Sequence, residues 1–165
     1  MTPKKQKSTP DPEGLFVEAW RFEEKGEFKK AFQCLLTGAR LGHSGCQINL
    51  GNFYASGKGI KRSLEEAAHW YKEAYKNADR TGAHNLAIDL RNEGKTRSAE
   101  VWFKKAIAMK DGSAYLVLAK MYMPRRNGKK AAAALLEKAL LLSRSDISED
   151  EKEEAESLLK ELAVS

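Results

Sequence analysis

A pattern of four residues recurs along this sequence at helical spacing. Each copy places a small residue, two large residues and another small residue at relative positions 0, +3, +4 and +7, which share one face of an α-helix. Small residues let a neighbouring helix approach closely, and the large pair fills the space between helices. The four copies are Ala31, Cys34, Leu35 and Gly38; Ala67, Trp70, Tyr71 and Ala74; Ala99, Trp102, Phe103 and Ala106; and Ala132, Leu135, Leu136 and Ala139, with Cys34, Leu135 and Gly38 as the variants.

A second pattern precedes each copy, namely a small residue followed three positions later by an aromatic residue or leucine. Its small residues are spaced by 32, 36 and 32 positions, and the first pattern by 36, 32 and 33. Leucine precedes the small residue in every copy except the first, which has Glu18. Two interleaved series with one mean period predict repeated pairs of helices, A and B. The second pattern comprises Ala19 and Phe22, Gly51 and Tyr54, Ala87 and Leu90, and Ala119 and Tyr122.

Glycines fall between the two helices of each pair, where helix ends favour them. Neither helix of a pair can bury its apolar stripe alone, so the pairs must stack on one another. We expect an all-α fold of about four antiparallel helix pairs and a C-terminal capping helix over 148–163. Ser148 and Glu151 form a capping box at its start. The expected pairs span approximately 14–42, 46–81, 83–111 and 114–143.

The distribution of apolar residues along the sequence predicts that no segment crosses a membrane. Residues 1–13 read as a flexible basic tail, and residues 14–165 as one repeat domain. No apolar stretch approaches the roughly 20 residues that cross a bilayer. We expect a cytoplasmic protein in which Cys34 and Cys46 are reduced thiols, although these two cysteines could pair.

Charge is distributed unevenly. Residues 1–143 carry 26 Lys and Arg against 15 Asp and Glu, whereas residues 144–165 carry 3 against 8. A basic body attracts nucleic acid, anionic lipid or an acidic protein face, and the acidic end could lie against the body as a counter-charge.

One repeat resembles the Sel1-like branch of the tetratricopeptide superfamily. That family's pattern is L-G-x-x-Y, then G-x-G-[VI], then A-x-x-W-[YF]-x-x-A. The other three repeats lack the G-x-G turn and are similar to ordinary tetratricopeptide units. The matching residues are Leu50, Gly51, Tyr54, Gly57, Gly59, Ile60, Ala67, Trp70, Tyr71 and Ala74.

This resemblance implies a right-handed α-α superhelix whose A helices line a concave groove, and a role as adaptor or scaffold. Positions of helix A outside the packing stripe are expected to face that groove or solvent. Exposed apolar residues beside amides and cations would suit an extended or helical peptide. The candidate groove residues are Phe16, Trp20, Ile48, Asn49, Asn52, His84, Asn85, Ile88, Arg91, Tyr115, Leu116 and Lys120.

No constellation of residues indicates catalysis. His43 and Cys46 have metal-ligand spacing, and Cys34 could lie nearby, but a zinc site needs three or four converging ligands. The better interpretation is that His43 is a turn residue and that Cys34 is a core residue at the position that tryptophan occupies in other copies. The aromatic pairs of the B helices, such as Trp102 and Phe103, have core spacing rather than that of a base-stacking surface. We expect a protein that is not an enzyme, with no cofactor, metal or small-molecule substrate.

Basic residues cluster in two turns between paired helices, and turns of successive repeats could align as one basic edge. It comprises Lys58, Lys61, Arg62, Arg125, Arg126, Lys129 and Lys130.

The main functional hypothesis is a non-catalytic protein-protein interaction module that binds a partner segment in the concave groove. The partner is a protein or peptide, with an acidic one among the options. Two alternatives stay open: an immunity or antitoxin-type protein that neutralises a cognate effector, and a nucleic-acid-binding protein that uses the basic body.

Overall fold

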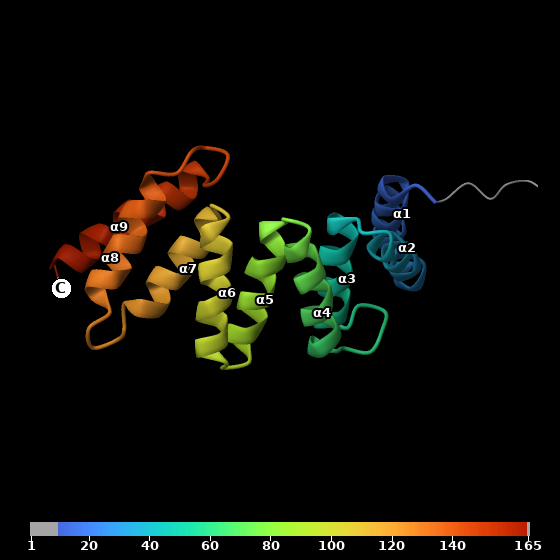
Figure 1. Ribbon diagram of the computed structural model, residues 1–165, viewed down its shortest axis with the longest axis horizontal. Coiled ribbons are helices and arrows are strands. Elements are labelled where there is room, and N and C mark those ends of the chain that lie inside the picture. Colours follow the sequence, from blue (N-terminus) through green and yellow to red (C-terminus); the bar gives the residue numbers. More distant parts are fainter. Residues whose placement is uncertain (1–9, 165) are drawn as a thin grey trace, which may run out of the picture. The chain divides into compact units, whose positions relative to one another are not determined.

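A computed structural model describes residues 10–164 of the chain (Figure 1). Over these residues it consists of nine α-helices joined by turns, without a strand. The predicted all-α fold is therefore confirmed. Of the tail predicted over 1–13, residues 1–9 lie outside the described part, and the first helix already begins at Pro12. The chain divides into two compact units, Met1–Asp79 and Arg80–Ser165, called unit 1 and unit 2, where one repeat domain was predicted over 14–165.

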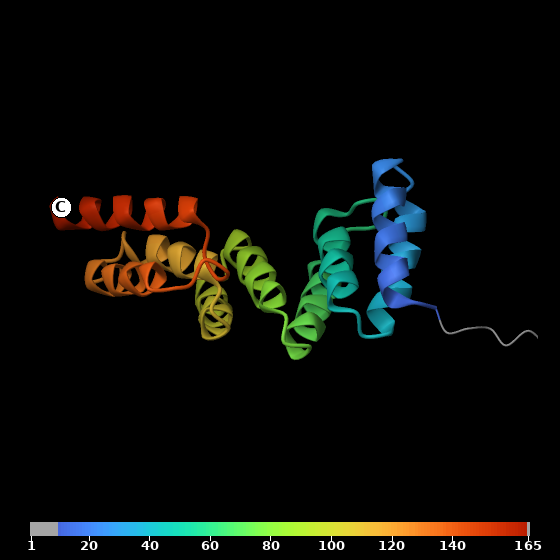
Figure 2. The same ribbon diagram turned by 90° about the horizontal axis from the view of Figure 1, so that it is seen from above.

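Unit 1 contains two antiparallel helix pairs (Figures 1 and 2). Helix α1 packs against α2, α3 packs against α4, and α2 also packs against α3. The pairs correspond to the repeats predicted over 14–42 and 46–81. The helices are α1 (Pro12–Glu24), α2 (Phe28–Arg40), α3 (Ser44–Ser56) and α4 (Leu64–Lys76).

Unit 2 contains two further pairs and a final helix that lies alongside α8 (Figure 2). Helix α9 packs against both α8 and α7, as the predicted capping helix should. Its capping box forms: the Glu151 amide donates to Ser148 Oγ at 3.2 Å, and the Ser148 amide to Glu151 Oε2 at 2.9 Å. The helices are α5 (Arg80–Asn92), α6 (Thr96–Ala108), α7 (Gly112–Tyr122), α8 (Lys129–Leu140) and α9 (Glu149–Val164).

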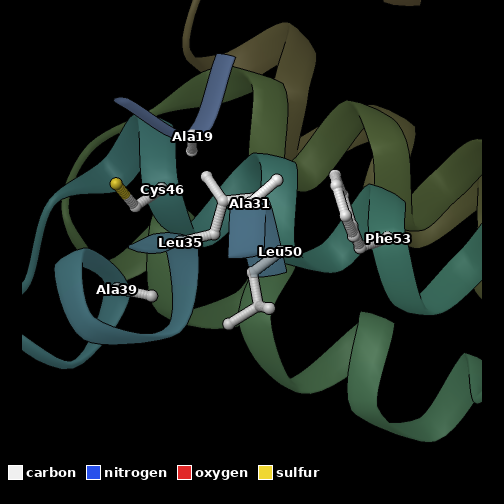
Figure 3. Close-up of a cluster of buried hydrophobic side chains, with 7 residues drawn as sticks. All are labelled: Ala19, Ala31, Leu35, Ala39, Cys46, Leu50 and Phe53. Atoms are coloured by element: carbon white, nitrogen blue, oxygen red, sulfur yellow. The ribbon is translucent and has the colours of Figure 1, made fainter. Parts of the chain in front are cut away.

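The core of unit 1 depends on the small residues of the repeat pattern. Its buried cluster draws on α1, α2 and α3 (Figure 3). A Cβ added at Gly38 would lie 2.4 Å from Cys46 Sγ, and one at Gly51 would lie 2.4 Å from the Tyr71 ring. Both glycines therefore permit helix contacts that a larger residue would block. The cluster is Ala19, Ala31, Leu35, Ala39, Cys46, Leu50 and Phe53.

The two large residues of each B-helix pattern are buried to different degrees. The residue at +4 is at most 2% exposed in every copy, whereas the residue at +3 is half-buried. The pattern therefore points the +4 side chain into the core and the +3 side chain to its border. The +4 residues are Leu35, Tyr71, Phe103 and Leu136, and the +3 residues are Cys34, Trp70, Trp102 and Leu135.

The G-x-G turn between α3 and α4 lies against the turn of the preceding pair. Gly57 and Gly59 have φ angles of +74° and +71°, a left-handed conformation that other residues adopt at a cost. A Cβ at Gly59 would lie 2.5 Å from Phe28 Cβ. The longer turn of this repeat thus needs glycine for its conformation and for its contact with Phe28.

Both cysteines are free thiols, as predicted. Cys46 is fully buried, and burial raises its pKa to about 12. His43 caps α3: the Cys46 amide donates to His43 Nδ1 at 3.1 Å, so the ring's proton lies on Nε2, which donates to Glu13 Oε2 at 3.0 Å. His43 thus lies in the turn before α3, as predicted, whereas Cys34, which was predicted as a core residue, is half-buried at the border of the core.

Candidate partner-binding surface

The A helices of unit 1, α1 and α3, present an exposed face that includes several predicted groove residues. Trp20 on α1 is 60% exposed, and Asn52 on α3 is also exposed. Phe16 on α1 and Asn49 on α3 are half-buried. We call this surface, formed by Phe16, Trp20, Asn49 and Asn52, the A-helix face of unit 1.

Local packing holds these side chains in place. Phe16 contacts the His43 ring at a centroid distance of 5.3 Å, and a Cβ at Gly45 would lie 3.3 Å from Phe16 Cε2. Glycine at position 45 therefore lets the Phe16 ring lie on the first turn of α3. On α3 itself, Asn52 Oδ1 accepts a hydrogen bond of 2.8 Å from the hydroxyl of the buried Tyr71 of α4. This hydrogen bond fixes the orientation of the Asn52 amide.

The exposed side of α1 carries more functional candidates than the sequence interpretation included. Glu13, Val17, Trp20 and Glu24 follow offsets of 0, +4, +7 and +11, so they form one stripe along the helix. All four are exposed, Val17 by 41%. The same helical spacing in the sequence could have identified Glu13, Val17 and Glu24, but they were outside the predicted groove set.

A hollow of about 630 Å³ lies along the first half of α1. Glu13 and Val17 line it, so it adjoins the stripe. Its charged side chains are three acids and one arginine, which makes it acidic. They are Asp11, Glu13, Glu18 and Arg21.

Two predicted groove residues do not belong to any accessible surface. Ile48 is 9% exposed and Leu116 is 3% exposed, so both are buried. Leu116 packs in the core formed by α7, α8 and α9. The prediction was wrong for these two residues because their positions on helix A face neighbouring helices in the stack.

In unit 2, the C-terminal helix α9 covers part of the exposed side of α7, an A helix. Lys120 Nζ forms an ion pair of 2.6 Å with Glu154 of α9, and Ser113 of α7 donates a hydrogen bond to Glu151. The acidic C-terminal segment therefore lies against the A helix of this unit and supplies a counter-charge to Lys120. On α5, Arg91 is exposed, while Asn85 and Ile88 are half-buried, as is Tyr115 on α7.

A second hollow, of about 400 Å³, is lined by the starts of α5, α7 and α9. Arg80 spans it: its guanidinium donates to Asp146 Oδ1 at 2.8 Å, to the Lys110 carbonyl at 2.7 Å and to the Ser145 carbonyl at 3.0 Å. His84 Nδ1 lies 2.9 Å from Asp111 Oδ2. Because these groups bind one another and join α5 to the loop before α9, we assign this cluster a structural role.

The predicted basic edge draws on both units, and a single ridge across them stays a prediction. In unit 1, Lys58 forms an ion pair of 2.6 Å with Glu23 and lies 4.8 Å from the centre of the Phe28 ring. The Arg62 side chain donates to the Ala55 carbonyl at 2.9 Å. Lys61 is exposed.

In unit 2, the edge residue Arg125 donates two hydrogen bonds of 3.1 Å to Glu100. Tyr122 and Lys104 also donate to Glu100, at 2.5 and 2.9 Å. Although partial burial opposes the change, these hydrogen bonds lower the pKa of Glu100 to about 2. Arg125 thus joins its loop to α6. The other basic residues here, Arg126, Lys129 and Lys130, are exposed.

The described residues hold no group of three or more His, Cys, Asp and Glu placed to bind a metal ion. Within the same residues, no helix is long and apolar enough to cross a membrane.

No family model matches this sequence. A chitin synthase regulator from Saccharomyces cerevisiae is 41% identical over 63 residues, which cover 38% of this chain and 9% of the regulator. The matched segment is thus a small part of that protein.

Solved structures match over most of the chain. A Sel1 repeat protein from Oxalobacter formigenes covers 78% of this chain with a TM-score of 0.64 and 19% identity. A protective antigen of uropathogenic Escherichia coli, which displays an SLR fold, covers 79% with a TM-score of 0.67 and 24% identity. This chain spans 57% and 30% of those two chains.

The chain has a Sel1-like repeat fold. A structure built of tetratricopeptide-like repeats also matches, with a TM-score of 0.57 and 14% identity over 92% of this chain. At these identities the likeness concerns the fold. The Sel1-like fold accounts for the alternating A and B helices of each unit.

Proposed function

We propose that this chain is a non-catalytic protein-binding module that holds a segment of a partner on the A-helix face of unit 1. The observation that carries the proposal is Trp20, a tryptophan that is 60% exposed one helical turn after Phe16. The Phe16 ring contacts the start of α3, the helix that carries Asn49 and Asn52. Tryptophan is enriched among the residues that dominate the energy of protein interfaces. An apolar anchor beside amides suits a partner whose backbone needs hydrogen bonds.

The similar proteins support the general function of protein binding. Proteins with the Sel1-like fold typically work through protein interactions. The Saccharomyces relative is named as a regulator of an enzyme, a role in which one protein acts on another. We extend to this chain only the general property of binding a protein partner.

Affinity capture from the native source, with partners quantified by mass spectrometry, tests the proposal. The test variant is Trp20→Ala. Val101→Ala is the matched control, because Val101 is a 54% exposed apolar residue on the B helix α6. Circular dichroism melting establishes that both variants are folded.

We expect Trp20→Ala to reduce the amount of the main captured protein by at least about tenfold, as for a central interface residue, and Val101→Ala to leave it unchanged. Equal capture by the native chain and the Trp20 variant would remove the A-helix face of unit 1 from the account.

The immunity-type role and nucleic-acid binding stay predictions. Within residues 80–143 there are 13 Lys and Arg against 5 Asp and Glu, but Lys95, Lys104, Lys120 and Arg125 already have carboxylate partners. The protein-binding proposal has the more specific support.

A further inference from the structure

Helix α1 is acidic, although the chain as a whole carries a formal charge of +6. Its 13 residues include four glutamates and one arginine, and Asp11 adds a further acid at its N-cap. One of these glutamates, Glu23, is neutralised by its ion pair with Lys58. The surface around Trp20 therefore differs in sign from most of the molecule.

The stripe on α1 places a carboxylate on each side of its apolar residues. Glu13 precedes Val17 by four positions, and Glu24 follows Trp20 by four. At a rise of 1.5 Å per residue, the backbones of Glu13 and Glu24 are about 16 Å apart. Two negative charges thus bracket an exposed valine and tryptophan.

Glu24 carries a charge that no neighbouring group within the described residues balances. Its side chain has no ion pair or hydrogen bond there, and an acid in the last turn of a helix is opposed by the helix dipole. A residue that served only the stability of α1 would favour the opposite charge. The Glu24 carboxylate is therefore available to a cation of a partner.

Helix α3 forms the other half of the A-helix face of unit 1 and adds no charge to it. Its sequence, SGCQINLGNFYAS, has no Asp, Glu, Lys or Arg. The nearest basic residues are Arg21 of α1 and Lys25, which follows the last residue of α1. At 100° per residue, both lie beyond the stripe on the side away from Phe16 and α3. The bracketed apolar pair is therefore flanked by neutral amides on one side.

We propose that the partner segment carries a basic residue on each side of an apolar anchor, with the two cations about 16 Å apart. This inference rests on the proposed function and specifies its ligand. The anchor packs against Val17 and Trp20, and the cations approach Glu13 and Glu24; the Trp20 ring also attracts a cation that lies over its face. An acidic segment would be repelled from both ends.

Selection from a displayed library of random 12-residue peptides tests this chemistry. The native chain and the Trp20→Ala variant are each immobilised, and peptides enriched on the native chain but not on the variant are sequenced. We expect these peptides to contain Lys or Arg on both sides of an aromatic or aliphatic residue at least about threefold more often than the starting library.

A charge reversal gives a second, independent readout. In Glu24→Lys we expect the best of those peptides, measured by fluorescence anisotropy, to bind about fivefold more weakly, with the difference decreasing at higher salt. The control is Arg97→Glu, a charge reversal at an exposed residue of the B helix α6 that lies outside the predicted groove and basic edge, which should leave the affinity unchanged.

The outcomes separate this inference from the proposed function. Peptides that depend on Trp20 but are rich in Asp and Glu, or show no charge preference, would overturn the inference and leave the A-helix face as the binding surface. The absence of any enriched peptide that depends on Trp20 would contradict both.

Discussion

Adjacent aromatic residues of α6 contribute unequally to the fold. Phe103 has no exposed surface, whereas the neighbouring Trp102 is half-buried and has Lys105 Nζ only 3.7 Å from the centre of its ring. Deleting a side chain from a filled core removes its contacts and leaves a cavity, while a border position can refill with solvent. Which of the two large residues contributes more to stability is therefore decided by its burial and not by its size.

We expect Phe103→Ala to lower the free energy of unfolding by about 3 to 5 kcal/mol, and Trp102→Ala by about 2 kcal/mol or less. Chemical denaturation followed by circular dichroism measures both. A larger loss for the tryptophan than for the phenylalanine would contradict this assignment of the core. The sequence pattern alone, which treats the two residues as one pair, predicts similar losses.

Glu100 gives stability that depends on pH. Its folded pKa of about 2 lies below the ordinary value of 4.5, so its contribution is present above pH 4.5 and is lost as the pH falls from 4.5 towards 2. The shift corresponds to at most about 3 kcal/mol, and solvent at this partly exposed site reduces it to about 1 to 2 kcal/mol.

For Glu100→Gln we therefore expect a loss of about 1 to 2 kcal/mol at pH 7 and almost none near pH 2. Thermal melts of both proteins from pH 7 to pH 2 compare them. A constant difference over that range would mean that the carboxylate charge does not stabilise the contact between α6 and α7.

At the scale of the elements, the G-x-G turn between α3 and α4 packs against Phe28 at the start of α2 and so helps to join the two helix pairs of unit 1. Gly59 and Gly26 have the same φ of +71°, but only Gly59 has a neighbouring side chain at its missing Cβ. We expect Gly26→Ala to cost about 1 kcal/mol for the left-handed conformation alone, and Gly59→Ala to cost more because it also displaces Phe28. Equal melting temperatures for the two variants would show that the contact with Phe28 is unimportant.

The helix A and helix B alternation could be predicted from the sequence because every B helix repeats the same four positions. The exposure of helix A could not be predicted equally well. Position 16 is half-buried in the first repeat, whereas the corresponding positions 48 and 116 are buried, because neighbouring helices cover these faces to different extents. The contact of α9 with Lys120 likewise depends on packing that no local pattern specifies.

At the scale of the whole molecule, the proposed binding surface lies on a helix whose charge is opposite to that of the chain. The alternation of helices establishes a Sel1-like fold, but the fold does not choose the partner. Trp20 was among the predicted groove residues, whereas the carboxylates around it became visible as a set only when the exposed side of α1 was known. Whether the partner contacts this side of α1 is the central question.

Photo-cross-linking from position 20 tests that contact most directly. A benzophenone amino acid replaces Trp20 in one protein and Val101 in another, and each is irradiated in an extract of the native source. We expect a cross-linked partner from position 20 and none from position 101. A partner that cross-links from position 101, or equally from both, would contradict this expectation.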